Sequence, residues 1–152
     1  MNQTPEEFED KDLVETVRTP SSQGEFVEGN LYDLVGGTEF FKNLCAKFYE
    51  GVAQDKILRP MYPEGDLAPA AERLQMFLEQ YWGGPKTYQE QRGHPRLRLR
   101  HQQFKINPAA RAAWVKHMRA ALDAQQLPVI YDEQMWGYLD SAATAMLNTF
   151  ED

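Results

Sequence analysis

Apolar residues recur at helical spacing in four segments of the chain, and this pattern predicts an all-α fold. The clearest stripe lies in residues 66–82, where apolar or small side chains follow the i, i+3, i+4 spacing of one buried helical face. Similar stripes predict three further helices at about 38–53, 108–124 and 132–150. No segment makes a convincing strand, so we expect the helices to pack against one another in pairs.

The same stripes predict which side chains form the core. The inward residues are expected to be Phe41, Leu44, Phe48 and Val52 in the first helix, Leu67, Ala70, Ala71, Leu74, Phe77, Leu78 and Tyr81 in the second, Trp114, Met118, Ala121 and Leu122 in the third, and Met135, Leu139, Ala142, Met146 and Phe150 in the last. A buried phenol needs a polar partner. Tyr49, on the wide apolar face of the first helix, is therefore expected to bond within the core or to point into a cavity.

Residues with capping preferences mark the predicted helix ends. Thr38 and Asp66 stand where N-cap acceptors belong, and Asn107 precedes a proline at the first helical position. Gly83 and Gly84 follow the second stripe and are expected to end that helix.

The connection between the second and third helices has few helix signals of its own. Pro85, Gly93 and Pro95 interrupt it. Residues 96–100 alternate between basic and apolar types, but an isolated strand has nothing to pair with here, so we expect a short helix or a turn.

Charge is unevenly distributed along the 152 residues, whose net charge is −7. Residues 1–30 contain eight acidic and two basic side chains, whereas residues 85–119 contain nine basic side chains and one acidic one. The acidic N-terminal segment has few large apolar residues to offset its ordering entropy. We therefore expect a disordered tail at 1–29 and one domain at 30–152.

Composition also restricts the class of protein. A single cysteine, Cys45, excludes an internal disulfide and favours the reducing cytoplasm. No apolar run is long enough to span a membrane, so no integral membrane segment is expected. An acidic chain whose arginines are interrupted by leucines is a poor candidate for nucleic-acid binding.

The candidate chemistry rests on three histidines: His94, His101 and His117. The chain has no paired His motif, no Cys-x-x-Cys, no Gly-rich phosphate loop and no serine on a nucleophile elbow, so zinc, di-iron and Ser-His-Asp sites are unsupported. One neutral imidazole is enough to hold a haem iron from one side, and nearby arginines suit the two haem carboxylates. Spacing alone does not choose among the three, and each is also compatible with a surface or core role.

Several motifs together resemble a known family. They are LYDLVGG at 31–37, KFY at 47–49, LRPMYP at 58–63, FLEQYWGGP at 77–85, RGHPRLRLRH at 92–101, and Trp114. In these residues the chain is similar to the truncated haemoglobins of the second group, small globins that form a two-over-two helical sandwich around a haem. The resemblance covers about 31–150 and leaves only the acidic segment outside.

The resemblance implies a role for individual residues. It places His101 as the proximal ligand of the iron of haem b, with Ala70 at the position where many globins carry a distal histidine. The remaining implied site residues are Tyr49, Tyr62, Leu74 and Trp114 in the distal ligand pocket, and Arg73, Arg100, Tyr81 and His94 at the haem propionates.

The implied function is reversible binding of dioxygen and other diatomic ligands. Ala70 has no hydrogen-bond donor, whereas Trp114, Tyr49 and Tyr62 do. Two hydrogen bonds to bound dioxygen, which carries partial negative charge, contribute about 3 kcal/mol and slow its release on the order of 100-fold. We therefore expect a slow-releasing oxygen binder that is poorly suited to oxygen delivery.

Three classes of function remain open at this point. The first adds redox chemistry on the bound ligand, with nitric oxide, peroxide or sulfide and an external reductant. The second is an oxygen or redox sensor or storage protein without catalysis. The third is a helical interaction module that has lost its cofactor, against which the presence of His101, Tyr49 and Trp114 argues. A homodimer is compatible with the sequence, which does not determine the oligomeric state.

Overall fold

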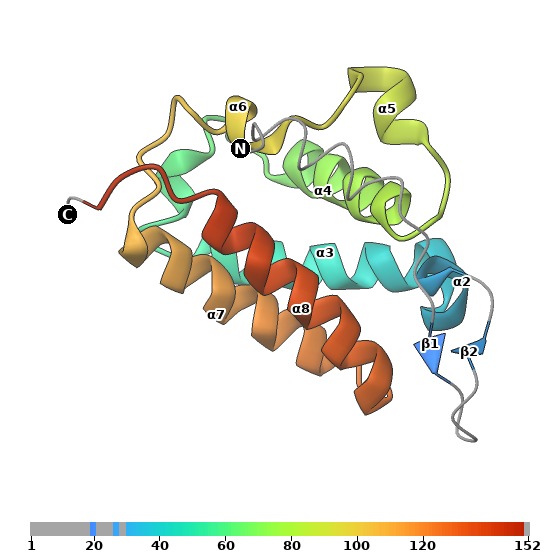
Figure 1. The fold of residues 1–152 in the computed structure, drawn as a ribbon. Helices are drawn as coiled ribbons and strands as arrows, with labels where there is room; N and C mark the ends of the chain where they lie inside the picture. The colour runs from blue at the N-terminus through green and yellow to red at the C-terminus, as the bar shows by residue number, and fades with distance from the viewer. Residues whose placement is uncertain (1–18, 21–25, 28–29, 151–152) are drawn as a thin grey trace, which may run out of the picture.

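The computed structural model describes residues 19–20, 26–27 and 30–150, and within 30–150 every regular element is a helix (Figure 1). The long helices are α3 (Gly37–Ala53), α4 (Ala68–Tyr81), α7 (Pro108–Ala124) and α8 (Val129–Ala145). The short ones are α2 (Leu31–Val35), the 3-10 turn η1 (Arg59–Met61), α5 (Thr87–Arg92) and α6 (Leu97–Arg100). The predicted all-α class is confirmed.

The long helices form two packed pairs. α3 packs on α4 and also on α7, and α7 packs on α8. Figure 1 shows the α3–α4 pair lying across the α7–α8 pair, with α5 and α6 above α4 and α7. This is the two-over-two arrangement that the resemblance implied. Among the described residues, none of the helices is both long and apolar enough to cross a membrane.

α3 is the central helix of the core because apolar residues cover more than one of its stripes. Seven of its side chains are buried: Phe40, Phe41, Leu44, Cys45, Phe48, Tyr49 and Val52. Cys45 is 1% exposed, and burial raises the pKa of its thiol well above the ordinary value, with the charge of Glu79 acting in the same direction. The predicted inward face of this helix is confirmed.

The helix caps agree with the sequence in part. The side chain of Asn107 accepts a hydrogen bond from the N–H of Ala110 and caps α7 as predicted. Asp66 accepts from the N–H of Ala68 at 2.9 Å, but the N-cap position of α4 belongs to Leu67. The prediction for Thr38 is wrong, because α3 begins one residue earlier and the Thr38 hydroxyl bonds that of Tyr32 at 2.6 Å.

Gly83 and Gly84 end α4 as predicted, and their lack of a side chain lets α2 approach closely. Gly83 has φ +93°, and a Cβ added there would lie 2.4 Å from Cβ of Asn30. A Cβ on Gly84 would lie 2.5 Å from the ring of Tyr32. Two hydrogen bonds cross this contact, from the Asn30 amide to the Gly83 carbonyl and from the N–H of Tyr32 to the carbonyl of Trp82.

The last helix differs from its predicted bounds. α8 begins at Val129 and ends at Ala145, whereas the apolar stripe predicted 132–150. Beyond it the chain turns toward Ile106, whose carbonyl accepts from the N–H groups of Asn148 and Thr149. Phe150 is 79% exposed, so its predicted inward position is wrong.

Helix α5 and a short strand pair lie outside the four predicted helices. α5 is bounded by the predicted breakers Pro85 and Gly93, and buried Tyr88 anchors it to the core. Thr19–Pro20 (β1) and Phe26–Val27 (β2) pair as a short antiparallel ladder, which the sequence did not predict. The rest of the predicted disordered tail, 1–18, 21–25 and 28–29, lies outside the described residues.

Candidate functional site

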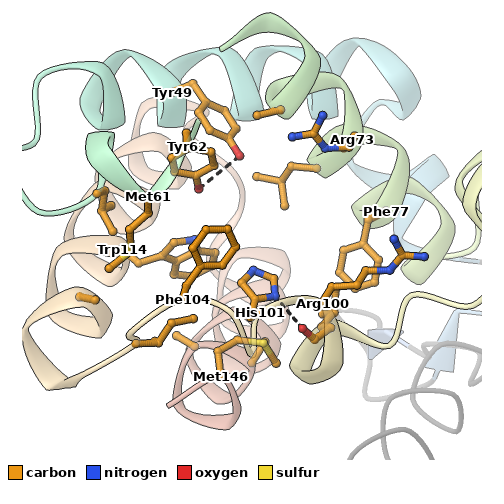
Figure 2. Close-up of a pocket in the computed structure, with 18 of the residues that line it drawn as sticks. Tyr49, Met61, Tyr62, Arg73, Phe77, Arg100, His101, Phe104, Trp114 and Met146 are labelled. Atoms are coloured by element: carbon orange, nitrogen blue, oxygen red, sulfur yellow. Dashed lines mark hydrogen bonds between the residues drawn. The ribbon is translucent and has the colours of Figure 1, made fainter. Parts of the chain in front are cut away.

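A cavity of about 500 Å3 lies between α3, α4, α7, α8 and the segment around α6. Its walls are largely apolar, with contributions from Phe77, Phe104, Ile106 and Met146. Figure 2 shows the polar side chains that interrupt these walls, with Tyr49 and Tyr62 on one side and His101 across from them. A concave, mostly apolar pocket with a few convergent polar groups is the usual form of a cofactor site.

His101 presents a neutral imidazole to this cavity. Its Nδ1 lies 2.6 Å from the carbonyl of Leu97, one turn earlier (Figure 2). A carbonyl only accepts, so Nδ1 carries the proton and Nε2 keeps its lone pair. Burial lowers the pKa of His101, although the Leu97 contact partly opposes this shift. A buried imidazole with a free Nε2 and a fixed tautomer is what a metal ligand requires.

The opposite side of the cavity carries two tyrosines and a tryptophan. The Tyr49 hydroxyl donates to that of Tyr62 at 3.5 Å, and the two rings meet edge to face. Burial raises the pKa of both phenols, so both remain protonated at neutral pH. The Trp114 ring packs on Phe48, and its indole N–H has no hydrogen-bond partner among the described residues.

The two aliphatic distal residues also line the cavity as predicted. Ala70, which is 3% exposed, and Leu74 lie one turn apart on α4. Neither has a side-chain donor, so the polar groups on this side come from α3, α7 and the residue after η1.

The four predicted propionate partners fall into two groups. Arg73 and Arg100 line the cavity. Tyr81 does not, and its ring stacks on that of Tyr138 with centroids 3.7 Å apart. His94 is exposed and also lies outside the lining. Arg92 and Arg111, which the sequence analysis did not assign to the propionates, also line the cavity, so Arg73 and Arg100 are two of its four arginines.

The two predicted propionate arginines, Arg73 and Arg100, already have partners within the chain. Arg73 forms an ion pair of 2.7 Å with Glu64, and this hydrogen bond holds the pKa of that carboxyl below its usual range. Arg100 donates to the carbonyls of Arg92 and Pro95 at 2.7 Å each and to that of His94 at 3.4 Å. Glu64 also lines the cavity, and sequence reasoning missed it because its partner comes from another element.

His117 has a structural position away from the cavity lining. Its Nε2 lies 2.7 Å from Oδ2 of Asp55. Its ring is so close to α3 that a Cβ on Gly51 would lie 2.3 Å from its Nδ1. Of the three histidines, only His101 faces the cavity.

The pocket fits a haem on three counts. One neutral imidazole offers a free Nε2, the walls are largely apolar, and the lining carries four arginines whose guanidinium groups can supply the positive charge that haem carboxylates need. Fold and pocket together define a helical haem protein of the globin class.

Comparison with known proteins identifies the family. The model of the bacterial-like globins matches residues 30–148. The group 2 truncated hemoglobin YjbI of Bacillus subtilis is 39% identical over 115 residues, which are 76% of this chain and 86% of that protein. The chain therefore belongs to the bacterial-like globins and, within them, to the group II truncated haemoglobins.

Solved structures agree with this assignment. A thermostable hemoglobin from the actinobacterium Thermobifida fusca is 56% identical with a TM-score of 0.79, covering 81% of this chain and all of that one (100%). A truncated oxygen-avid haemoglobin from Bacillus subtilis is 38% identical with a TM-score of 0.75, covering 79% of this chain and 100% of that one. Membership of this family implies a haem and the binding of dioxygen and related ligands.

Proposed function

We propose that this globin holds haem b through His101 and binds dioxygen with slow release. Bound haem would supply an iron that can take a diatomic ligand and change its oxidation state, with His101 as the residue that would hold it. The single cysteine supports a haem without covalent attachment, because Cys45 is buried in α3 and is not part of the cavity lining. The same lone thiol supports a cytoplasmic location.

The observation that carries the proposal is the set of hydrogen-bond donors that line the cavity together with Ala70. Trp114 lines the cavity with an indole N–H that has no partner among the described residues. Tyr49 donates to Tyr62, which leaves the Tyr62 proton available to the ligand. Each hydrogen bond to a partly charged ligand contributes roughly 1–2 kcal/mol, so two of them slow dissociation by about 100-fold.

One relative of known structure is in keeping with this proposal. The Bacillus subtilis haemoglobin at 38% identity is described as oxygen-avid. Avid binding is the property expected here from the Trp114 and Tyr62 donors.

Trp114→Phe tests the proposal with little change in packing. The variant keeps an aromatic ring against Phe48 and loses only the donor, so its dioxygen dissociation rate in stopped flow should rise about tenfold. Trp136→Phe is the matched control, because Trp136 lies on α8 under Arg119 and does not line the cavity. An unchanged rate in Trp114→Phe, or an equal rise in the control, would contradict the role of Trp114.

We further propose redox chemistry on the bound ligand, favoured by the two protonated phenols beside the ligand position. Reduction of peroxide to water consumes protons as well as electrons, and the phenols hold protons within the cavity. The electrons come from an external reductant. Turnover of peroxide with ascorbate, or reaction of the oxygenated form with nitric oxide or with sulfide, distinguishes this activity from an oxygen or redox sensor or storage protein. Turnover that does not exceed that of free haem would favour the latter.

The assembly of the protein remains a prediction. A homodimer is compatible with the sequence, and sedimentation velocity on the haem-loaded protein measures the oligomeric state directly.

A further inference from the structure

The short helix α6 and the loop after it, which carry His101, are too short to be stable without contacts from other parts of the fold. α6 has only four residues and begins after Arg96, whose φ of 43° is left-handed, without a side-chain cap. A helix this short is unstable in isolation, because it gains too few hydrogen bonds to offset the cost of nucleation. No helix follows until α7 begins at Pro108. The position of the imidazole must therefore be fixed by contacts from elsewhere.

The side before His101 is fixed by Arg100. Its guanidinium donates to the carbonyls of Arg92 and Pro95, which ties α6 to the preceding loop. This contact fixes the start of the segment and leaves its end, at residues 101–106, still to be held.

The side after His101 is fixed by Asn148, which follows α8. Its side-chain Oδ1 accepts from the N–H of Ile106 at 2.9 Å, and its Nδ2 donates to the carbonyls of Phe104 at 2.9 Å and His101 at 3.3 Å. Its backbone N–H donates to the carbonyl of Ile106 at 3.0 Å. One residue thus contacts both ends of the loop from a distance of more than forty positions in the sequence.

A primary amide has the chemistry that this contact needs. Asn offers an acceptor oxygen and two donors on one short side chain, whereas a hydroxyl has one donor and a carboxylate has none. Asn148 also joins two parts of the same cavity wall, because Phe104 and Ile106 line the cavity from the loop and Met146 lines it from the end of α8. The Phe104 ring in turn lies against the His101 imidazole, with centroids 6.3 Å apart.

We propose that Asn148 is a positioning residue for His101, setting the place and tilt of the imidazole through its hydrogen bonds to the 101–106 loop. The inference rests on His101 as the iron ligand. Asn148 itself does not line the cavity, so it acts only through the loop.

The first experiment compares Asn148→Ala and Asn148→Asp with the wild type. Alanine removes all three side-chain bonds, whereas aspartate keeps the acceptor for Ile106 and turns an oxygen toward the two carbonyls. Phe150→Ala is the control, since Phe150 lies two residues further on and is 79% exposed. The readouts are the iron–histidine stretching band of the ferrous protein in resonance Raman and the rate of haem loss to a scavenging protein.

Both Asn148 variants should shift or broaden the iron–histidine band and lose haem roughly tenfold faster, as expected for one or two lost hydrogen bonds. The Phe150 control should do neither. If both Asn148 variants fold and have the same iron–histidine band and the same rate of haem loss as the wild type, the proposal is overturned.

A second experiment separates positioning from general loosening of the fold. In His101→Gly, free imidazole replaces the side chain and is not attached to the loop. Adding Asn148→Ala to this background should leave the iron–imidazole band unchanged. If Asn148→Ala shifted the iron–imidazole band in His101→Gly as much as it shifts the iron–histidine band when His101 is present, the proposal would be overturned. Asn148 would then act on the whole pocket and not through the loop that carries His101.

The same background also tests the assumption beneath the proposal. If His101→Gly without added imidazole kept the iron–histidine band, His101 would not be the ligand, and the assignments of both His101 and Asn148 would fall. If His101→Gly lost that band but the Asn148 variants kept the wild-type band and haem-loss rate, His101 would remain the ligand and only the role of Asn148 would be overturned.

Discussion

Nε2 of His117 lies 2.7 Å from Oδ2 of Asp55, and this hydrogen bond joins α7 to the residues after α3. The other carboxylate oxygen accepts from the backbone N–H groups of Ile57 and Leu58. Burial acts to raise the pKa of Asp55, but the hydrogen bonds outweigh it and the pKa is lowered from its ordinary value of 3.8. The ionised carboxylate is therefore part of what stabilises the fold.

Asp55→Asn should reveal this contribution through pH. Since the pKa of Asp55 is lower in the folded state than in the unfolded state, its contribution is present above the unfolded value and is lost as pH falls through the folded value. The variant should lose about 1–2 kcal/mol at neutral pH, and the difference from wild type should narrow only below about pH 3.8. Urea unfolding across this range measures it. A gap that stays constant down to about pH 2 would contradict this role of the ionised carboxylate.

Gly51→Ala should destabilise the protein by about 1–3 kcal/mol, because the new Cβ would stand 2.3 Å from Nδ1 of His117. The ring cannot move aside without losing its contact with Asp55. Gly137→Ala is the matched control within a helix, since nothing lies within 4 Å of its added Cβ. That variant should gain about 0.5–1 kcal/mol from helix propensity. Thermal unfolding of the two variants measures whether Gly51→Ala lowers the stability and Gly137→Ala raises it.

His101→Ala should alter haem binding, whereas His117→Ala should alter only the stability of the fold. Loss of His101 removes the free Nε2 from the cavity, so the absorption spectrum of the ferrous haem complex should change and haem should dissociate faster. Loss of His117 removes only the Asp55 contact, so the spectrum should be retained while thermal stability falls. Equal spectral changes in the two variants would contradict the assignment of the proximal ligand.

The two distal tyrosines should not be equivalent. Tyr49 donates to Tyr62, so Tyr62 holds the proton that is free to bond the ligand. Tyr62→Phe should therefore raise the dioxygen dissociation rate by about tenfold, and Tyr49→Phe by about threefold or less. Tyr131→Phe, on α8 and outside the lining, is the control in stopped flow. The reverse order of the two rates would show that the hydrogen bond runs the other way in the loaded protein.

Arg73 and Glu64 should affect haem retention with opposite signs. If Arg73 binds a propionate, Glu64 competes for it, because the two form an ion pair of 2.7 Å. Arg73→Met should speed haem loss, roughly threefold to tenfold, and Glu64→Gln should slow it. Transfer of haem to a scavenging protein measures both. Faster loss in both variants would show that the pair stabilises the pocket as a unit and that Arg73 is not a propionate partner.

Local chemistry accounts for what the sequence predicted well. Asn107 caps α7 and Gly83 ends α4, because each acts on backbone groups within a few residues. The stripe of α3 predicted its core face because one helix presents those residues together. The resemblance supplied His101 and the distal residues, all of which line the cavity.

Contacts between distant segments account for what the sequence missed. α5 is held by a hydrogen bond from the N–H of Gln89 to the side chain of Gln80, which no periodicity shows. α8 ends early because the following residues bond Ile106 on another element, so the apolar stripe overstated its length. The ion pair of Arg73 with Glu64 likewise depends on a loop whose path the sequence leaves open.

Because Cys45 is buried in α3, its reaction with a thiol reagent can report opening of the core. The thiol is the chain's single cysteine, is 1% exposed, and is kept protonated by its surroundings in α3. A thiol reagent can react with it only when the packing around α3 opens. The labelling rate therefore counts opening events of the core in the unaltered protein, and comparing it with and without haem measures how far the cofactor holds the four long helices together.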